Sequence, residues 1–272
     1  EKQLTTLGNN IHALEVNGNF DDCQQLVKQA FTDAELNKQL FLTSANSINV
    51  ARWLPQQFYY FFAYKQWINS PLGDGGQPPV IAVPSGNFGN ICAGILAHMS
   101  GLPVKHFIAA CNANDIVPNF MQSQQYQPKP AVATISNAMD VGNPSNFVRI
   151  LELFHQQFPQ LKEKFSSVSI TDEETKQTMK RVYDEVKYTL DPHGAVGYLA
   201  LERYLSAVGD SPQKGIFLET AHPVKFYDVV EPVLNQTIAL PDAVKDIIDL
   251  PKKSTVMDVS FEALKDYLLK AV

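Results

Sequence analysis

The order of strand-like and helix-like segments predicts an α/β fold with a mostly parallel sheet flanked by helices. The strongest signal is the apolar run VIAV at 80–83, followed by a helical pattern over 90–100 and a second apolar run over 104–110. This order is typical of a parallel strand–helix–strand crossover. Segment 214–234 continues the alternation with a strand, a turn and a helix.

Periodicity predicts four further segments in the first quarter of the chain. The alternation in IHALEV predicts a strand over 11–16, and apolar residues at three- and four-residue steps predict a helix over 21–31. Segment 41–49 resembles a strand. The aromatic run over 53–67 predicts a helix, bent or restarted at Pro55.

Three later helices begin at recognisable capping sequences. An Asn-Pro pair opens the helix expected over 143–158, and an Asp-Pro pair opens another over 191–207. Between them, Thr171 and Glu174 have the spacing of a capping box at the start of a helix over 171–186.

Composition restricts the class of protein. The 272 residues are 45% hydrophobic and 18% charged, which is typical of a globular chain. A net charge of −6 without a long basic run argues against nucleic acid or an anionic membrane as the main partner. No apolar run has the length of a membrane span, and no signal peptide is visible. Cys23, Cys92 and Cys111 form no CxxC pair, so we expect reduced thiols and a cytoplasmic location.

Two kinds of site are not expected. The six histidines show no pairing at a spacing that binds metal, so we predict no metal site. A GxSxG motif is absent, which argues against a serine hydrolase.

The junction SGNFGN at 85–90 lies between an expected strand and an expected helix. Small residues let the backbone approach a phosphate, and the start of a helix attracts an anion. The sequence matches neither GxGxxG nor a P-loop, so an ordinary turn remains an equal alternative.

Four other polar segments carry candidate residues, and each has a structural alternative. Segment 44–49 and the loop 136–146 contain residues that form helix caps and local turns as often as binding sites. Asp191 is accounted for as the start of a helix, whereas that structural explanation does not cover His193. Segment 219–225 follows a strand, on the usual ligand side of an α/β sheet.

Taken together, these segments resemble the threonine synthase family, in its bacterial and fungal branch, over essentially the whole chain. Six motifs occur in the family's order: LGNNIHALEVNGNFDDCQQLVKQAF, SANSINVAR, VPSGNFGNICAG, SNAMDVGNPSN, DPHGAVG and TAHPVKF. The resemblance implies a tryptophan synthase β-like fold of type II, with the N-terminal part missing. It also implies pyridoxal 5'-phosphate as cofactor, and conversion of O-phospho-L-homoserine and water to L-threonine and phosphate.

The resemblance implies roles for particular residues. The cradle for the cofactor phosphate would be Gly86, Asn87, Phe88, Gly89 and Asn90. Thr220 would place its hydroxyl at the pyridine nitrogen. Residues near the site that would hold substrate anions are Asn46, Ser47, Asn49 and Arg52. Asp191 and His193 belong to a family motif but receive no role.

One departure from the family pattern is large. The Schiff-base lysine in a Phe-Lys-Asp context and the Ser-Gly-Asp-Thr-Gly loop do not occur in this sequence, and Lys225 lies in a different motif. We therefore expect a C-terminal portion that is inactive alone and exposes apolar surface, which favours self-association. Residues 1–45 would be the remainder of a small mobile domain, and 46–272 an incomplete large cofactor-binding domain.

Two alternatives stay open at this point. Another enzyme of the same fold type, such as a threonine dehydratase or a cysteine synthase, shares a glycine-rich cradle. A domain that binds a phosphate-bearing ligand without catalysis would also explain the missing lysine.

Overall fold

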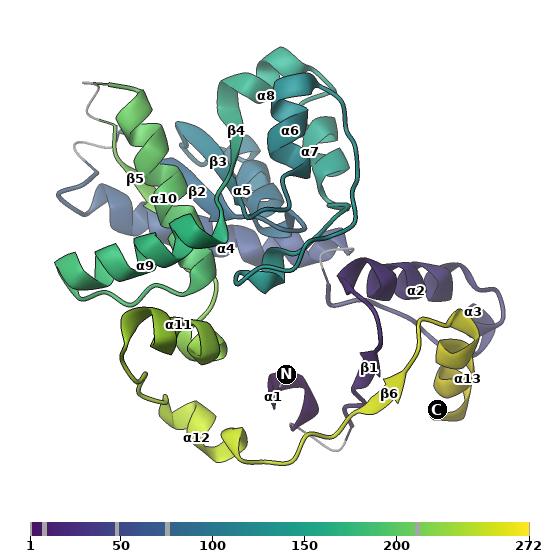
Figure 1. Cartoon of the computed structure of the whole chain (residues 1–272). Helices are drawn as coiled ribbons and strands as arrows, with labels where there is room; N and C mark the ends of the chain where they lie inside the picture. The colour runs from purple at the N-terminus through teal and green to yellow at the C-terminus, as the bar shows by residue number, and fades with distance from the viewer. Residues whose placement is uncertain (1, 7–9, 47–48, 74–76, 210–212, 272) are drawn as a thin grey trace. The chain divides into compact units, whose positions relative to one another are not determined.

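The computed structural model describes residues 2–6, 10–46, 49–73, 77–209 and 213–271 (Figure 1). The chain forms two compact units, one of residues 44–237 and one that joins 1–43 to 238–272. The sequence-based division at 45/46 differs from this grouping at the C-terminal end. Segment 238–272 belongs with the N-terminal segment because β1 (Leu14–Val16) pairs in parallel with β6 (Thr255–Met257). The roles expected for the two domains stay predictions.

A four-stranded sheet organises the larger unit. Its order is β4-β3-β2-β5, and all three pairings are parallel, which confirms the predicted α/β class. The strands are β2 (Val80–Pro84), β3 (His106–Cys111), β4 (Phe165–Ser169) and β5 (Gly215–Phe217). The crossover expected over 80–110 is therefore confirmed, whereas β4 was not expected.

Helices cover both faces of this sheet, because alternate residues of β2 and β3 point to opposite sides. On one face Ile81, Val83 and Phe107 share a core with residues of α5 (Gly89–Met99). On the other face Val80, Ala82 and Ile108 share a core with residues of α10 (Pro192–Ala207). Figure 1 shows α5 and α10 beside the strands of this sheet.

Six further helices of this unit are α4 (Trp53–Ile68), α6 (Ile116–Ser123), α7 (Phe147–Leu153), α8 (Phe158–Lys164), α9 (Asp172–Val186) and α11 (Tyr227–Leu234). Three short 3-10 turns are η1 (Val50–Arg52), η2 (Asn137–Met139) and η3 (Pro223–Phe226). The capping box at the start of α9 and the Asp191 cap of α10 are confirmed.

Three sequence-based predictions differ from the structure. Of the helix expected over 143–158, only α7 (147–153) forms: it begins after Asn146 and not at the Asn-Pro pair of 143–144. It cannot continue to 158 because His155 and Gln156 adopt left-handed φ angles of 52° and 57°. The described part of 41–49 contains no strand, and Ser44 Oγ instead accepts the backbone N–H of Asn46 in a local turn. Pro55 lies in the first turn of α4, where no intrahelical hydrogen bond is lost, so no break is needed there.

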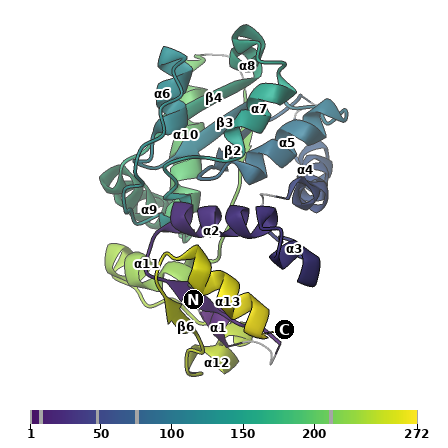
Figure 2. The same cartoon turned by 90° about the vertical axis from the view of Figure 1, so that its right-hand side faces the viewer.

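The smaller unit is built around the two-stranded sheet of β1 and β6. Its helices are α1 (Lys2–Thr5), α2 (Phe20–Thr32), α3 (Leu36–Gln39), α12 (Asp242–Ile248) and α13 (Phe261–Ala271). Figure 2 shows α13 beside α2, and Lys265 of α13 forms a 2.9 Å ion pair with Asp33 at the end of α2. Within the described ranges, we find no helix of the length and apolarity that crossing a membrane requires.

Candidate functional site

The candidate cradle begins where β2 ends. Ser85 is buried and donates its backbone N–H to Ala110 O at 2.8 Å, which extends the pairing of β2 with β3. Phe88 then adopts φ 63° and ψ 11°, the left-handed conformation, directly before α5. Its ring is buried and packs edge-to-face on Phe147, with ring centroids 5.7 Å apart. This contact holds an unusual backbone angle in place.

The start of α5 can bind an anion. The first turn of a helix leaves N–H groups without intrahelical partners, and the helix dipole favours negative charge there. A left-handed residue directly before helical residues turns successive N–H groups toward one point, which makes an anion-binding concavity. Phe88 and Gly89 have this arrangement. The junction therefore has a backbone geometry that suits an anion.

Position 86 requires glycine because the backbone of η2 lies very close to it. A Cβ atom at this position would lie 2.5 Å from Met139 Cα, in the turn η2. No side chain fits at that distance, so the polar loop 136–146 and the cradle are in direct contact. Two of the polar segments singled out in the sequence thus meet.

Asn87 joins the cradle to the same loop further along the chain. Its Oδ1 accepts the backbone N–H of Ser145 at 2.7 Å and the Ser145 hydroxyl at 3.0 Å. Asn146 is buried and donates its Nδ2 to Asn87 O at 2.8 Å. Arg149 in turn donates to Asn146 Oδ1 and lies over the ring of Trp53. Ser145, Asn146 and Arg149 were not predicted as site residues, and only the polar composition of 143–146 pointed toward them.

Asn90 fastens α4 to the start of α5. Its Oδ1 accepts the hydroxyls of Tyr59 at 2.6 Å and Tyr60 at 2.7 Å. Burial raises the pKa of Tyr59 to about 12, and the nearby positive charge of Arg52 opposes this rise. Arg52 therefore lies within electrostatic reach of the residue that holds Asn90.

The residues predicted to hold substrate anions lie mostly in local turns. Asn49 caps η1 by accepting the Ala51 N–H at 3.0 Å, and the Arg52 guanidinium donates to Ala45 O. Asn46 shares the turn through its backbone oxygen, which accepts the N–H of Asn49. Ser47 lies outside the described residues. The structure does not test a substrate role for any of the four.

Thr220 lies at the same edge of the sheet as the cradle. Ala82 of β2 pairs with Phe217 of β5, and Leu218 N–H donates to Ala82 O at 3.0 Å. Parallel strands bring their carboxyl ends to one edge, so Thr220 and Ser85 both follow strand ends there. Thr220 is exposed, as is Lys225, which lies in η3.

Comparison with known proteins agrees with this arrangement. A family model described as "Pyridoxal-phosphate dependent enzyme" matches residues 1–216, and a model of the threonine synthase C-terminal region matches residues 194–268. The chain belongs to the family of pyridoxal-phosphate dependent enzymes.

Several of its relatives are threonine synthases. The chain is 48% identical to the threonine synthase of Serratia marcescens, over 99% of this chain and 60% of that protein. The crystal structure of the Escherichia coli enzyme superposes with a TM-score of 0.92 at 46% identity, covering 100% of this chain and 61% of that one. A structure from Brucella melitensis titled as bound to pyridoxal phosphate gives a TM-score of 0.84 at 32% identity. The chain spans about 60% of the length of the curated relatives it matches.

The residues at the sheet edge fit the family's cofactor. Backbone N–H groups at Gly89 and the left-handed turn before it suit a phosphate, and Thr220 offers a neutral hydroxyl at the same edge. The assignment of individual residues to the cofactor remains a prediction.

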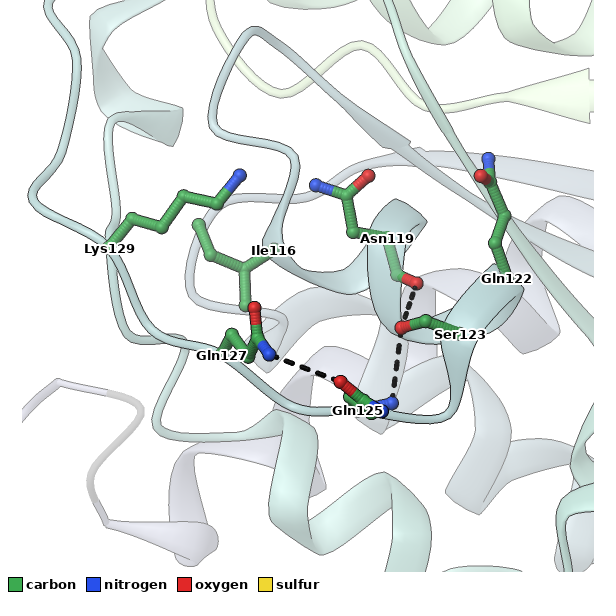
Figure 3. A pocket seen from close by; sticks show the side chains of 7 residues that line it. All are labelled: Ile116, Asn119, Gln122, Ser123, Gln125, Gln127 and Lys129. Carbon is green, nitrogen blue, oxygen red and sulfur yellow. Dashed lines mark hydrogen bonds between the residues drawn. The ribbon is translucent and has the colours of Figure 1, made fainter.

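A polar cavity of about 350 Å³ lies elsewhere, between α6 and the segment that follows it (Figure 3). Its lining residues are Ile116, Asn119, Gln122, Ser123, Gln125, Gln127 and Lys129. Lys129, its one charged residue, pairs with Asp115 at 3.0 Å. None of the predicted site residues lines this cavity, so we do not assign the pyridoxal-phosphate site to it.

Proposed function

We propose that this chain carries the cofactor-binding part of a threonine synthase. The whole protein would convert O-phospho-L-homoserine and water to L-threonine and phosphate. The observation that carries the proposal is the left-handed Phe88 at the buried start of α5, at the carboxyl edge of the sheet, where α/β proteins generally bind their ligands. The 48% identity to a threonine synthase supports this choice within the family.

Different residues would bind the phosphate end and the pyridine end of the cofactor. The N–H groups around Gly89 would hold the cofactor phosphate, and the Thr220 hydroxyl would meet the pyridine nitrogen without enforcing a proton on it. The cation of Arg52 would hold a carboxylate or a phosphate of the substrate. When bound, pyridoxal phosphate supplies an electron sink for carbanions of the substrate.

We assign the Schiff-base amine to a residue outside these 272. The family's lysine motif does not occur among them, and Lys225 is exposed in a different motif. That amine is needed both as covalent anchor and as acid–base group, so the 272 residues alone should bind the cofactor without turning over.

Substrate choice is tested on the whole protein that contains this chain. We expect phosphate release from O-phospho-L-homoserine and no ammonia release from L-threonine. Ammonia release from L-threonine would favour a dehydratase and contradict the proposal.

The cradle is tested on the chain itself with Gly86→Ala. Its methyl group would meet Met139 Cα at 2.5 Å and push the η2 turn away from the cradle, so pyridoxal phosphate should bind roughly tenfold more weakly or worse. Fluorescence titration measures the affinity. Gly209→Ala is the matched control, since its added methyl meets no atom within 4 Å although φ is +70°. Equal affinity of the two variants for pyridoxal phosphate would show that the cradle does not bind the phosphate. Borohydride reduction should leave the chain at 30.3 kDa.

A further inference from the structure

Asp191 and His193 form a buried polar pair at the start of α10. Asp191 is fully buried and His193 is 2% exposed. Asp191 Oδ1 accepts the N–H of Gly194 at 2.7 Å, which caps the helix. Its Oδ2 lies 2.8 Å from His193 Nδ1. Capping needs only one carboxylate oxygen, so the bond to His193 serves another purpose.

His193 uses its second ring nitrogen to hold the turn η2. Nε2 lies 3.2 Å from the backbone nitrogen of Ala138. A backbone N–H can only donate, so Nε2 accepts and carries no proton. The proton therefore lies on Nδ1 and is donated to Asp191. Phe226 packs against the ring, with centroids 4.6 Å apart, so the imidazole is fixed from three sides.

The turn that His193 holds is the one that contacts the cradle. Met139 directly follows Ala138 and is the residue against which Gly86 packs. At the end of the turn, Asp140 is held by the hydroxyl of Thr134 at 2.7 Å and by Asn112 Nδ2 at 2.8 Å. The hydrogen bond from the Ala138 N–H to His193 thus joins this turn to α10.

The start of α10 also contacts Glu219, the residue before Thr220. A Cβ atom at Gly194 would lie within 2.6 Å of both carboxylate oxygens of Glu219, so this carboxyl lies directly on the start of α10. Burial, and after it the charge and hydrogen bond of Asp191, raise the pKa of Glu219 to about 8. Protonated Glu219 can donate to Asp191. The start of α10 therefore contacts His193 through Asp191 and contacts Glu219, the neighbour of Thr220, through Gly194.

We propose that Asp191 and His193 are positioning residues that hold η2 against the Gly86 cradle and, through Glu219, set the position of Thr220. The pair would couple the phosphate end of the cofactor site to its pyridine end. This inference rests on the proposed function, because it concerns the same site.

Two polar substitutions separate the two hydrogen bonds of the His193 imidazole. In His193→Asn the side-chain amide falls near the position of Nδ1, so the donor to Asp191 is kept and the acceptor for Ala138 is lost. In His193→Gln the amide reaches the position of Nε2, so an acceptor for Ala138 is kept. Both variants are polar and of similar size, which makes each the control for the other.

We expect His193→Asn to weaken binding of pyridoxal phosphate by roughly five- to tenfold, the effect of one lost hydrogen bond, and His193→Gln, which keeps the acceptor for Ala138 but loses the donor to Asp191, to weaken it clearly less. Hydrogen exchange of the Ala138 amide should accelerate in His193→Asn and not in His193→Gln. The ¹⁵N shifts of His193 in the unsubstituted chain should show Nδ1 protonated and Nε2 unprotonated.

Three results would overturn the inference. The first is unchanged Ala138 exchange in His193→Asn. The second is equal loss of affinity in both variants, accompanied by equal loss of melting temperature, which is the result of a merely structural role. The third is a proton on Nε2. If the unsubstituted chain does not bind pyridoxal phosphate, the cofactor role proposed for this chain fails, while Ala138 exchange still decides whether His193 positions the turn.

Discussion

Phe88 shows how packing can hold a residue other than glycine in the left-handed conformation. For an L-residue other than glycine, the left-handed conformation costs about 1–2 kcal/mol, and such angles persist where the surroundings enforce them. Phe88 keeps it with a buried ring against Phe147. Sequence reasoning assigns positive φ to glycines first, whereas Gly86 is needed for its closeness to Met139 and has no positive φ. The turn could be predicted, but the residue that takes the unusual angle depends on packing.

Glu219 should make the stability of the chain depend on pH. Its pKa is raised from 4.5 to about 8, by burial first and then by the Asp191 carboxylate. A raised pKa means that the folded chain binds the proton more tightly than the unfolded chain does. The contribution of Glu219 to stability is therefore fully present below about pH 4.5 and is lost as the pH rises toward 8. Tyr188 also faces this carboxylate, and burial, followed by Glu219 and Asp191, raises its pKa.

Glu219→Gln should remove this fall, because glutamine keeps a donor for Asp191 and carries no charge. We expect nearly equal Tm values at pH 5. At pH 8.5 the variant should be more stable by about 2 °C or less, because the side chain of Glu219 is exposed and solvent screens its charge. Thermal unfolding at the two pH values measures the effect. Glu163→Gln, at an exposed carboxylate of α8, is the control, and an equal pH response in both variants would contradict the assignment.

At the scale of elements, the capping sequences at Thr171 and Asp191 predicted the starts of α9 and α10 correctly, whereas α7 begins at Phe147 and not at the expected Asn-Pro pair. Thr171 accepts the N–H of Glu174, and Glu174 Oε2 accepts the N–H of Thr171 at 2.8 Å, so the capping box closes as expected. Arg203 of α10 also binds Glu174, and this bond is the main cause that lowers the pKa of Glu174 to about 2. The box thus fixes both the start of α9 and its contact with α10.

Thr171→Ala removes the side-chain acceptor for the first turn of α9. We expect the free energy of unfolding to fall by about 1 kcal/mol, the usual cost of a lost N-cap. Chemical denaturation measures it. Lys176→Ala, at an exposed position in the interior of the same helix, should change stability little and serves as the control. A loss as large in Lys176→Ala would show that the cap is not the cause.

Strands and helix ends were predicted less well, for physical reasons. β4 has the sequence FSSVS, whose serines give no continuous apolar run, and it is recognised only by its pairing with β3. β6 has three residues and pairs with β1 from the other end of the chain. His155 and Gln156 end α7 in left-handed conformations that such residues seldom adopt.

At the scale of the whole chain, the sequence predicts which segments reach the sheet edge but not how they interlock. Two strands followed by polar turns placed the cradle and Thr220 at one edge. The contacts that join the cradle to loop 136–146, through Gly86 and Asn87, depend on tertiary packing between residues more than 50 positions apart. The resemblance to a family supplied chemical roles that spacing alone could not.

The larger unit carries an exposed apolar stripe on α4, which bears on the expected self-association. Leu54, Phe58, Phe61 and Phe62 recur at three- and four-residue steps and are 57%, 61%, 41% and 67% exposed. Contiguous apolar surface of this kind favours association in water. The mass of the chain in light scattering should therefore rise above 30.3 kDa as its concentration increases.

Phe58→Gln combined with Phe62→Gln should reduce this association, because glutamine keeps the helix propensity of the positions and removes two of the largest apolar side chains. Val148→Gln changes a residue of similar exposure, 55%, on α7, and should leave the association unchanged. If the unsubstituted chain is a monodisperse monomer, the stripe does not drive association. If Val148→Gln has the same effect as the double variant, general surface hydrophobicity and not α4 is responsible.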